Sequence, residues 1–220
     1  TSTLPKRYDI DPDAFTFHDY DQSSPIYQTY TRSETWIEAD APKMRQLAES
    51  IASVEKGPVA VAREFYDYVR SSLNREGIPW TGDHVAYRDQ YGALATYLRG
   101  SGSCQNQALV FVALCRAAGI PARTVHGING IMLGEERNLE DWSHAWAEFY
   151  LPGLGWVPVD PIGDQFAEVS QLRIVLSLGN NIDLDPPCTS TDWYCYGGDA
   201  LTLSSPIPYA DLHFKATLAE

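Results

Sequence analysis

Residues 100–123 decide the fold, and they read GSGSCQNQALVFVALCRAAGIPAR. A glycine-rich turn precedes Cys104, and the residues that follow it are apolar on nearly every face of a helix. A helix that is hydrophobic on most faces lies buried at the centre of its domain. Gly119, with Pro121 just after it, is typical of a helix C-terminus. The stretch therefore predicts a central, buried helix that starts at Cys104.

Cys104 stands at the start of that helix, where a thiolate is favoured. The N-terminus of a helix carries roughly half a positive charge, and its free N–H groups can hold an oxyanion. Cys115 follows eleven residues later, which is about 16 Å along a helix, whereas a disulfide needs Cα atoms within about 7 Å. We therefore predict that Cys115 is a core residue. Cys104 is either a nucleophile or, as is usual for a free cysteine, a small buried hydrophobe.

Before residue 100 the apolar residues recur at helical spacing, and after residue 121 they form short runs typical of strands. The predicted helices are one capped by Asp40 that ends near Ile51, one from Val61 to near Gly77, and a short one over 93–98. The predicted strands are 122–128, 144–151, 156–158 and 201–203, with 209–218 as a further candidate. Helices followed by strands predict an α+β fold, with the helices packed on an antiparallel β-sheet or partial barrel.

A nucleophilic cysteine needs a base, and the base needs a group that orients it. His144 begins a predicted strand, and strand alternation places His144, Trp146 and Glu148 on one face. A turn at 152–155 would fold the next strand back along the first, so that Asp160 lies beside His144. This order supplies a cysteine, a histidine and an aspartate for one site.

Other residues compete for these roles. His126 and Asp141 are alternative partners for the cysteine. The remaining histidines have no paired acid nearby and are interpreted as structural; they are His18, His84 and His213.

The motifs resemble, in order and spacing, those of the transglutaminase-like superfamily. They are GSC at 102–104, ALCRAAGIPAR at 113–123, HAW at 144–146 and WVPVDP at 156–161. The resemblance covers roughly residues 36–165 and implies a papain-like α+β core. It also implies a triad of Cys104 as nucleophile, His144 as base and later acid, and Asp160 as the orienter of the imidazole. Arg116 and the segment 119–123 would be structural.

The resemblance further implies an acyl-transfer enzyme that acts on a peptide or protein amide through a Cys104 thioester. Hydrolysis of the peptidase or amidase type is favoured. The alternatives are transamidation to an amine acceptor, which cross-links proteins, and a binding module with a retired site. The side chain that completes the oxyanion hole stays open among Gln105, Gln107 and Tyr97.

No cofactor and no metal site are predicted. Asp9, Asp11 and Asp13 alternate as in a calcium loop, but Ala14 and Tyr20 stand where an EF-hand needs Gly and Glu. We interpret this segment as solvated.

The chain is expected to form one domain. Its parts are an extended lead-in (1–35), the transglutaminase-like core (36–165) and a C-terminal extension packed on that core (166–220). With 16 basic and 29 acidic residues, the net charge is −13, which argues against nucleic acid as a partner.

The longest apolar run, 108–115, is too short to span a membrane, and no signal peptide is recognised. Cys188 and Cys195 lie in a turn-rich stretch. An extracytoplasmic or secreted location is favoured, because these cysteines could form a local disulfide; two free thiols would instead suit the cytoplasm.

Overall fold

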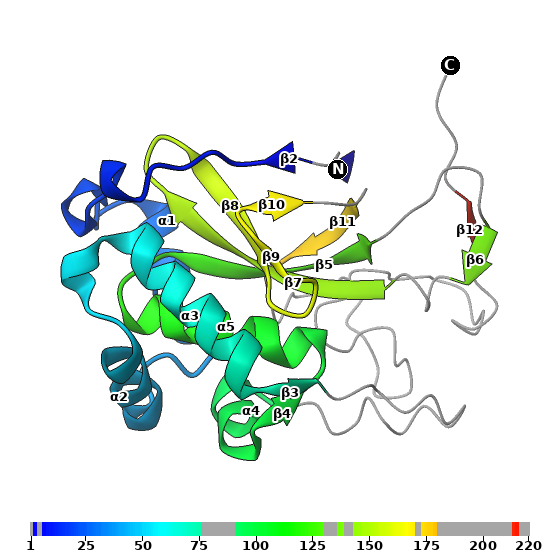
Figure 1. The fold of residues 1–220 in the computed structure, drawn as a ribbon, viewed down its shortest axis with the longest axis horizontal. Helices are drawn as coiled ribbons and strands as arrows, with labels where there is room; N and C mark the ends of the chain where they lie inside the picture. Colours follow the sequence, from blue (N-terminus) through cyan, green and yellow to red (C-terminus); the bar gives the residue numbers. More distant parts are fainter. Residues whose placement is uncertain are drawn as a thin grey trace.

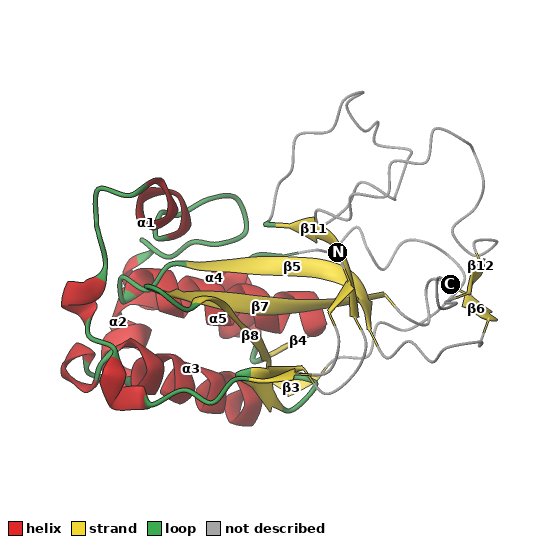
Figure 2. Cartoon of the chain, turned by 90° about the horizontal axis from the view of Figure 1, so that it is seen from above, coloured by secondary structure: helices red, strands yellow, loops and turns green. Residues whose placement is uncertain are grey.

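The protein builds two layers, with most of its helices on one face of an open antiparallel sheet (Figure 1). The computed structural model describes residues 2–3, 6–75, 91–129, 136–138, 143–169, 173–179 and 213–215. Helix α5 (Cys104–Ala117) lies against the middle of the sheet, and α2, α3 and α4 pack around it. In Figure 2, which views the molecule from above, α4 and α5 lie behind strands β5 and β7. The α+β prediction is confirmed, with a sheet that does not close into a barrel.

The main sheet has the strand order β1-β11-β5-β7-β8-β9, and each neighbouring pair is antiparallel. Its strands are β1 (Ser2–Thr3), β5 (Ala122–Asn129), β7 (Ser143–Leu151), β8 (Gly155–Asp160), β9 (Gln165–Phe166) and β11 (Arg173–Leu178). Two-stranded pairs join β2 (Lys6–Arg7) to β10 (Glu168–Val169), β6 (Glu136–Asn138) to β12 (His213–Lys215), and β3 (Asn74–Arg75) to β4 (Ser101–Gly102).

The predicted strands 122–128, 144–151 and 156–158 are confirmed as β5, β7 and β8. Strand β11 was not predicted. It returns across the sheet to pair with β5, so its place depends on partners far away in the sequence. The predictions for 201–203, Asp141, His84 and the Cys188–Cys195 bridge lie outside the described residues.

The other helices are α1 (Pro25–Tyr30), α2 (Pro42–Ile51), α3 (Pro58–Ser72) and α4 (Ala93–Arg99), with short 3₁₀ turns η1 (Pro12–Ala14), η2 (Phe17–Asp19) and η3 (Val54–Lys56). Within the lead-in that was expected to be extended, the structure instead has helical turns at 12–14, 17–19 and 25–30. The Ser24 hydroxyl caps α1 by accepting from the Tyr27 N–H, and Pro25 occupies its first turn. A helix of six residues is too short to show apolar periodicity.

Two helix ends also differ from their predictions. Ala41, not Asp40, is the N-cap of α2. The Asp40 carboxylate instead accepts a hydrogen bond from the Ser33 hydroxyl, which removes it from the capping position. The next helix starts earlier, at Pro58, and ends at Ser72 rather than near Gly77.

Helix α5 forms the centre of the hydrophobic core. Every side chain from Asn106 to Arg116 is buried, and Cys115 is fully buried among them. The alternate β7 residues Ala147, Phe149 and Leu151 belong to the same core. The predicted buried helix is thus confirmed, and alternation turns His144 and its strand partners to the opposite face of β7.

Arg116 is buried at the C-terminal end of α5, where it ties the helix to neighbouring segments. Its Nε donates to the carbonyl of Ala122 at 2.9 Å, and its Nη1 donates to the carbonyl of Arg32 at 2.8 Å. Nη1 also lies 2.8 Å from the Glu34 carboxylate. These partners give Arg116 a structural role.

Among the described helices, no segment combines the length and the hydropathy that a transmembrane span requires.

Candidate active site

Cys104 is the first residue of α5, and the turn before it is held by side-chain hydrogen bonds. Asn106 Oδ1 accepts from the Ser103 backbone N–H at 3.1 Å and from the Ser103 hydroxyl at 2.8 Å. Asn106 Nδ2 donates to the carbonyl of Tyr91 at 2.9 Å. These hydrogen bonds fix the start of α5, which carries the Cys104 thiol. The first backbone N–H groups of the helix have no acceptor within it.

The glycines before Cys104 have local structural reasons. Gly100 has a φ of 72° and ends α4 in the left-handed region. At Gly102, an added Cβ would lie 2.5 Å from the Asn106 Cβ and 3.1 Å from the Thr96 Cγ2. Glycine at this position allows the turn to pack closely on α4 and α5.

The structure brings the three predicted site residues together. His144 Nε2 lies 2.7 Å from Asp160 Oδ2, and the His144 ring is hydrogen-bonded to the Cys104 thiol. Ala147 of β7 pairs with Val159 of β8, so Asp160 lies level with Trp146 and diagonal to His144 on the same face of the sheet. The hairpin between the strands thus creates the contact that the sequence suggested.

The electrostatics of the site favour charge separation between sulfur and imidazole. Burial raises the pKa of Cys104, but the His144 ring and the Ala145 backbone N–H outweigh it, and the pKa of Cys104 falls below its usual range. Burial lowers the pKa of His144, but its hydrogen bonds to Asp160 and Cys104 outweigh it and raise that pKa. The pair is therefore set up to exist as thiolate and imidazolium.

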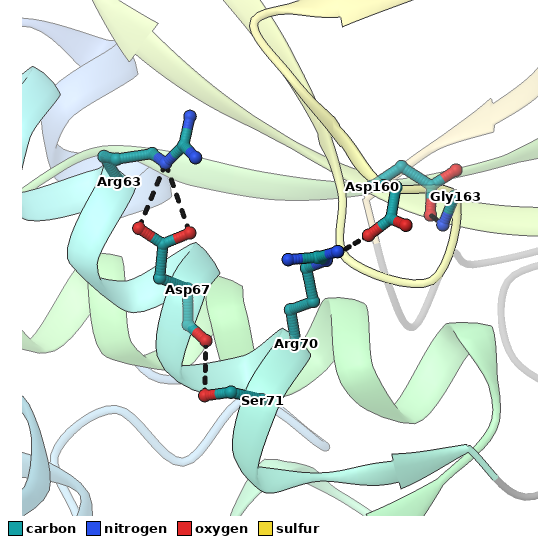
Figure 3. Close-up of polar contacts among 7 residues, drawn as sticks. Arg63, Asp67, Arg70, Ser71, Asp160 and Gly163 are labelled. Carbon is teal, nitrogen blue, oxygen red and sulfur yellow. Dashed lines mark hydrogen bonds and ion pairs between the residues drawn. The ribbon is translucent and has the colours of Figure 1, made fainter.

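Asp160 is buried, with a side chain that is 1% exposed, and each of its oxygens has a partner. Oδ1 accepts from the Gly163 backbone N–H at 2.9 Å, and Oδ2 accepts from Arg173 Nη2 at 2.7 Å in addition to His144. Burial raises the pKa of Asp160, but these partners outweigh it and hold the pKa below its usual range. Figure 3 shows the Gly163 contact, with α3 residue Arg70 nearby; Arg70 pairs with Asp164 in the same turn.

Sequence reasoning missed the partners of Asp160. The run Asp160-Pro161-Ile162-Gly163 is a turn signal that could have indicated the Gly163 contact. Arg173 has no comparable signal, because it lies 13 residues away and reaches Asp160 only through the return of β11 to the sheet.

His126, the competing base, lies on β5 opposite Ala145 and is 3% exposed. Burial, followed by the nearby charge of His144, lowers the pKa of His126 to about 4. His126 is thus neutral at physiological pH, and Asp160 binds His144 instead.

The three candidates for the oxyanion hole have different environments. Gln107 is buried and donates to the carbonyl of Gly102 at 3.4 Å, so its amide is turned inward. Gln105 is half-buried in the first turn of α5, and Tyr97 packs against the edge of the core.

Within the part of the chain that the structure describes, no three His, Cys, Asp or Glu side chains group as a metal site would require. Asp11 has a local role instead, because its Oδ1 accepts from the Asp13 N–H and caps η1.

We expect Gly163→Ala to lower the activity of this site without removing any of its functional groups. An added Cβ would lie 2.6 Å from Asp160 Oδ2, so the carboxylate must move away from His144. Gly163 does not have a positive φ, and the N–H that it donates is kept in the variant. A displacement of this kind is expected to lower kcat/KM by roughly 10- to 100-fold, measured beside thermal unfolding.

Gly153→Ala is the matched control. Gly153 lies in the turn between β7 and β8, has a φ of 80°, and has no atom within 4 Å of an added Cβ. This variant should lose about 1 kcal/mol of stability and keep its activity. A folded Gly163→Ala protein with the wild-type rate would contradict the role assigned to this contact.

Comparison with known proteins places the chain among relatives of the same family. Residues 45–161, more than half of the chain, match the Transglutaminase-like superfamily. An uncharacterized protein of Haemophilus influenzae is 30% identical in an alignment of 173 residues, which covers 70% of this chain and 43% of that protein. A protein-glutamine gamma-glutamyltransferase of Pseudomonas aeruginosa is 42% identical over 65 residues, 28% of this chain and 10% of that enzyme.

Among solved structures, the periplasmic domain of TgpA from Pseudomonas aeruginosa aligns with a TM-score of 0.43 and 24% identity, over 70% of this chain and 48% of that one. The chain spans less than half the length of the curated relatives named above.

Proposed function

Because the chain belongs to the transglutaminase-like superfamily, we propose that it transfers acyl groups from a peptide or protein amide through a thioester on Cys104. The observation that carries this proposal is the chain of hydrogen bonds from the Cys104 thiol through His144 to Asp160. A nucleophile, a base and an orienting acid in this arrangement are what covalent acyl transfer requires.

The proposed reaction starts with proton transfer from Cys104 to His144. His144 Nε2 is engaged by Asp160, so Nδ1 is the nitrogen that takes the proton. The thiolate then attacks the amide carbonyl carbon, and the backbone N–H of Cys104 stabilises the oxyanion. His144 returns the proton to the leaving amine, and the C–N bond breaks to leave a thioester.

We propose water as the first acceptor of the acyl group. Cys104 is only partly buried at the start of α5, which supports access of water to a thioester there. His144 would take a proton from water, the hydroxide would attack the thioester carbonyl, and a carboxylic acid and the thiol would be released. The enzyme would then act as a peptidase or amidase.

A primary amine is the second candidate acceptor. It is favoured by the 42% identity to a protein that is named as a protein-glutamine gamma-glutamyltransferase. The amine would attack the same thioester and form a new amide bond in place of the acid. The net charge of −13 would attract a cationic amine by long-range steering.

The reactivity of Cys104 toward iodoacetamide, measured against pH with mass mapping of the labelled residue, tests the site without a substrate. We expect fast labelling of Cys104 well below the usual thiol pKa of about 8.5, because its pKa is lowered by His144. As the pH falls through that lowered pKa, the thiolate is protonated and the rate declines. Buried Cys115 should remain unlabelled in the folded protein.

Labelling with an ordinary thiol profile would contradict the proposal and favour a binding module. With a reactive Cys104 established, peptide amides incubated with and without a primary amine separate the two acceptors. Release of the acid in the presence of excess amine supports hydrolysis, and an amine–acyl conjugate supports transamidation.

A further inference from the structure

A fully buried arginine lies behind the site. Arg173 on β11 is 0% exposed. Its Nη2 donates to Asp160 Oδ2 at 2.7 Å and to Gln165 Oε1 at 2.8 Å, and its Nε donates to Asn129 Oδ1 at 3.0 Å. β11 and β8 are separated by β5 and β7 in the sheet, so the guanidinium makes these contacts across a face of the sheet.

Trp146 contacts both Arg173 and the site histidine, His144. The guanidinium carbon of Arg173 lies 4.7 Å from the centre of the Trp146 ring, and the His144 ring is stacked on the same tryptophan with centres 6.3 Å apart. Trp146 is itself 2% exposed. Charges in such a dry environment are poorly screened, so Arg173 acts on its neighbours more strongly than a surface arginine would.

Stability alone does not explain why Arg173 is buried at this position. A buried charge is costly, and a buried ion pair is on average weak evidence of net stabilisation. Within the described residues, the buried Nη1 of Arg173 has no hydrogen-bond acceptor, and a buried donor without an acceptor is unfavourable. The guanidinium therefore keeps its contact with Asp160 although one of its donors has no acceptor among the described residues.

We infer that Arg173 is a positioning residue of the Cys104–His144–Asp160 site. It holds the Asp160 carboxylate against His144 and offsets its negative charge, so that the cysteine–histidine pair is active at lower pH than with Asp160 alone. This inference rests on the function proposed above, because it assigns a role within the same reaction.

The direction of the effect follows from the charges around Asp160. Its oxygen Oδ2 is shared by the His144 imidazole and the Arg173 guanidinium. The negative charge of Asp160 raises the pKa of both Cys104 and His144, and a positive charge beside it reduces that effect. The other charged or titratable groups here are Glu148, which acts on Arg173, His126 on β5, and the Arg70–Asp164 pair beside the turn.

The test is the pH profile of Cys104 alkylation in Arg173→Gln and Arg173→Lys. The acid limb of this profile is the pH range over which the alkylation rate falls as the Cys104 thiolate is protonated. In Arg173→Gln the acid limb should shift to higher pH by about one unit, because the charge of Asp160 is no longer offset. Arg173→Lys retains the positive charge and should return the limb toward the wild-type position. A residue with a merely structural role would change stability without moving this limb.

Gln165→Glu provides a second variant that leaves Arg173 in place. The new carboxylate would lie beside the guanidinium, where Gln165 now accepts at 2.8 Å, and would neutralise it. The acid limb should move in the same direction as in Arg173→Gln. This variant keeps the inference testable if Arg173→Gln does not fold.

Arg116→Gln is the matched control, because it removes a second buried arginine at the far end of α5. It should lower the unfolding temperature and leave the alkylation profile unchanged. Folded Arg173→Gln or Gln165→Glu protein with the wild-type limb would overturn the inference. An ordinary thiol profile in the wild-type protein would instead overturn the proposed function itself, so the two failures are distinguishable.

Discussion

Replacing Cys104 with alanine is expected to abolish amide turnover while the protein remains folded. Without the thiol no thioester can form, and loss of a covalent nucleophile typically costs at least ~10⁴-fold in kcat. Cys104 is only partly buried at the start of α5, so alanine removes little packing. The free energy of unfolding should change by less than about 1 kcal/mol. Steady-state rates and thermal unfolding of the same preparation check both parts.

Cys115→Ala is the matched control for this experiment. Cys115 is fully buried in the same helix, and its replacement leaves a small cavity in the core. We expect a stability loss on the order of 1–2 kcal/mol with the turnover number retained. Turnover that survives in Cys104→Ala would refute the thioester mechanism, because no other residue has been assigned as nucleophile.

Replacing His144 with alanine is expected to have the second largest effect. Cys104 would lose the partner that lowers its pKa and would return toward the usual thiol value of about 8.5. At pH 6 its thiolate fraction would then be below about 1%, so the alkylation rate at this pH should fall below that of the wild-type protein. Turnover should fall by about 10²- to 10⁴-fold, because the base and acid of both half-reactions is lost.

His126→Gln separates the two histidines that compete for this role. His126 is held neutral by burial and has a pKa of about 4, so its loss should leave the alkylation profile of Cys104 in place. If the alkylation rate is unchanged in His144→Ala and falls in His126→Gln, then His126 is the base and the assignment of His144 is wrong.

Much of the fold could be predicted from local patterns. The apolar run after Cys104 predicted the buried helix α5, and Gly119 marked its end with a φ of 81°. The alternation in β7 and the turn before β8 predicted the hairpin that places Asp160 beside His144. These features depend on neighbours in the sequence, so residue spacing was enough to find them.

Other features depended on single side-chain contacts rather than on a repeated pattern of apolar residues. The short helix α1 is set by the Ser24 cap rather than by periodicity. Asp40 looked like a helix cap, but Ser33 binds its carboxylate. Both partners lie close together in the sequence, but apolar periodicity does not report which polar side chain a carboxylate or a helix end will bind.

The sequence by itself determined the α+β class, the helix that presents Cys104, and the order of cysteine, histidine and aspartate along the chain. Only the tertiary structure decided what surrounds Asp160. Arg173 meets that carboxylate because β11 returns to pair with β5, and Gly163 meets it because the turn after β8 folds back on itself. A buried carboxylate keeps its charge only when polar partners surround it. The Gly163 contact is local to the turn, but Arg173 was selected by strand pairing, which residue spacing does not show.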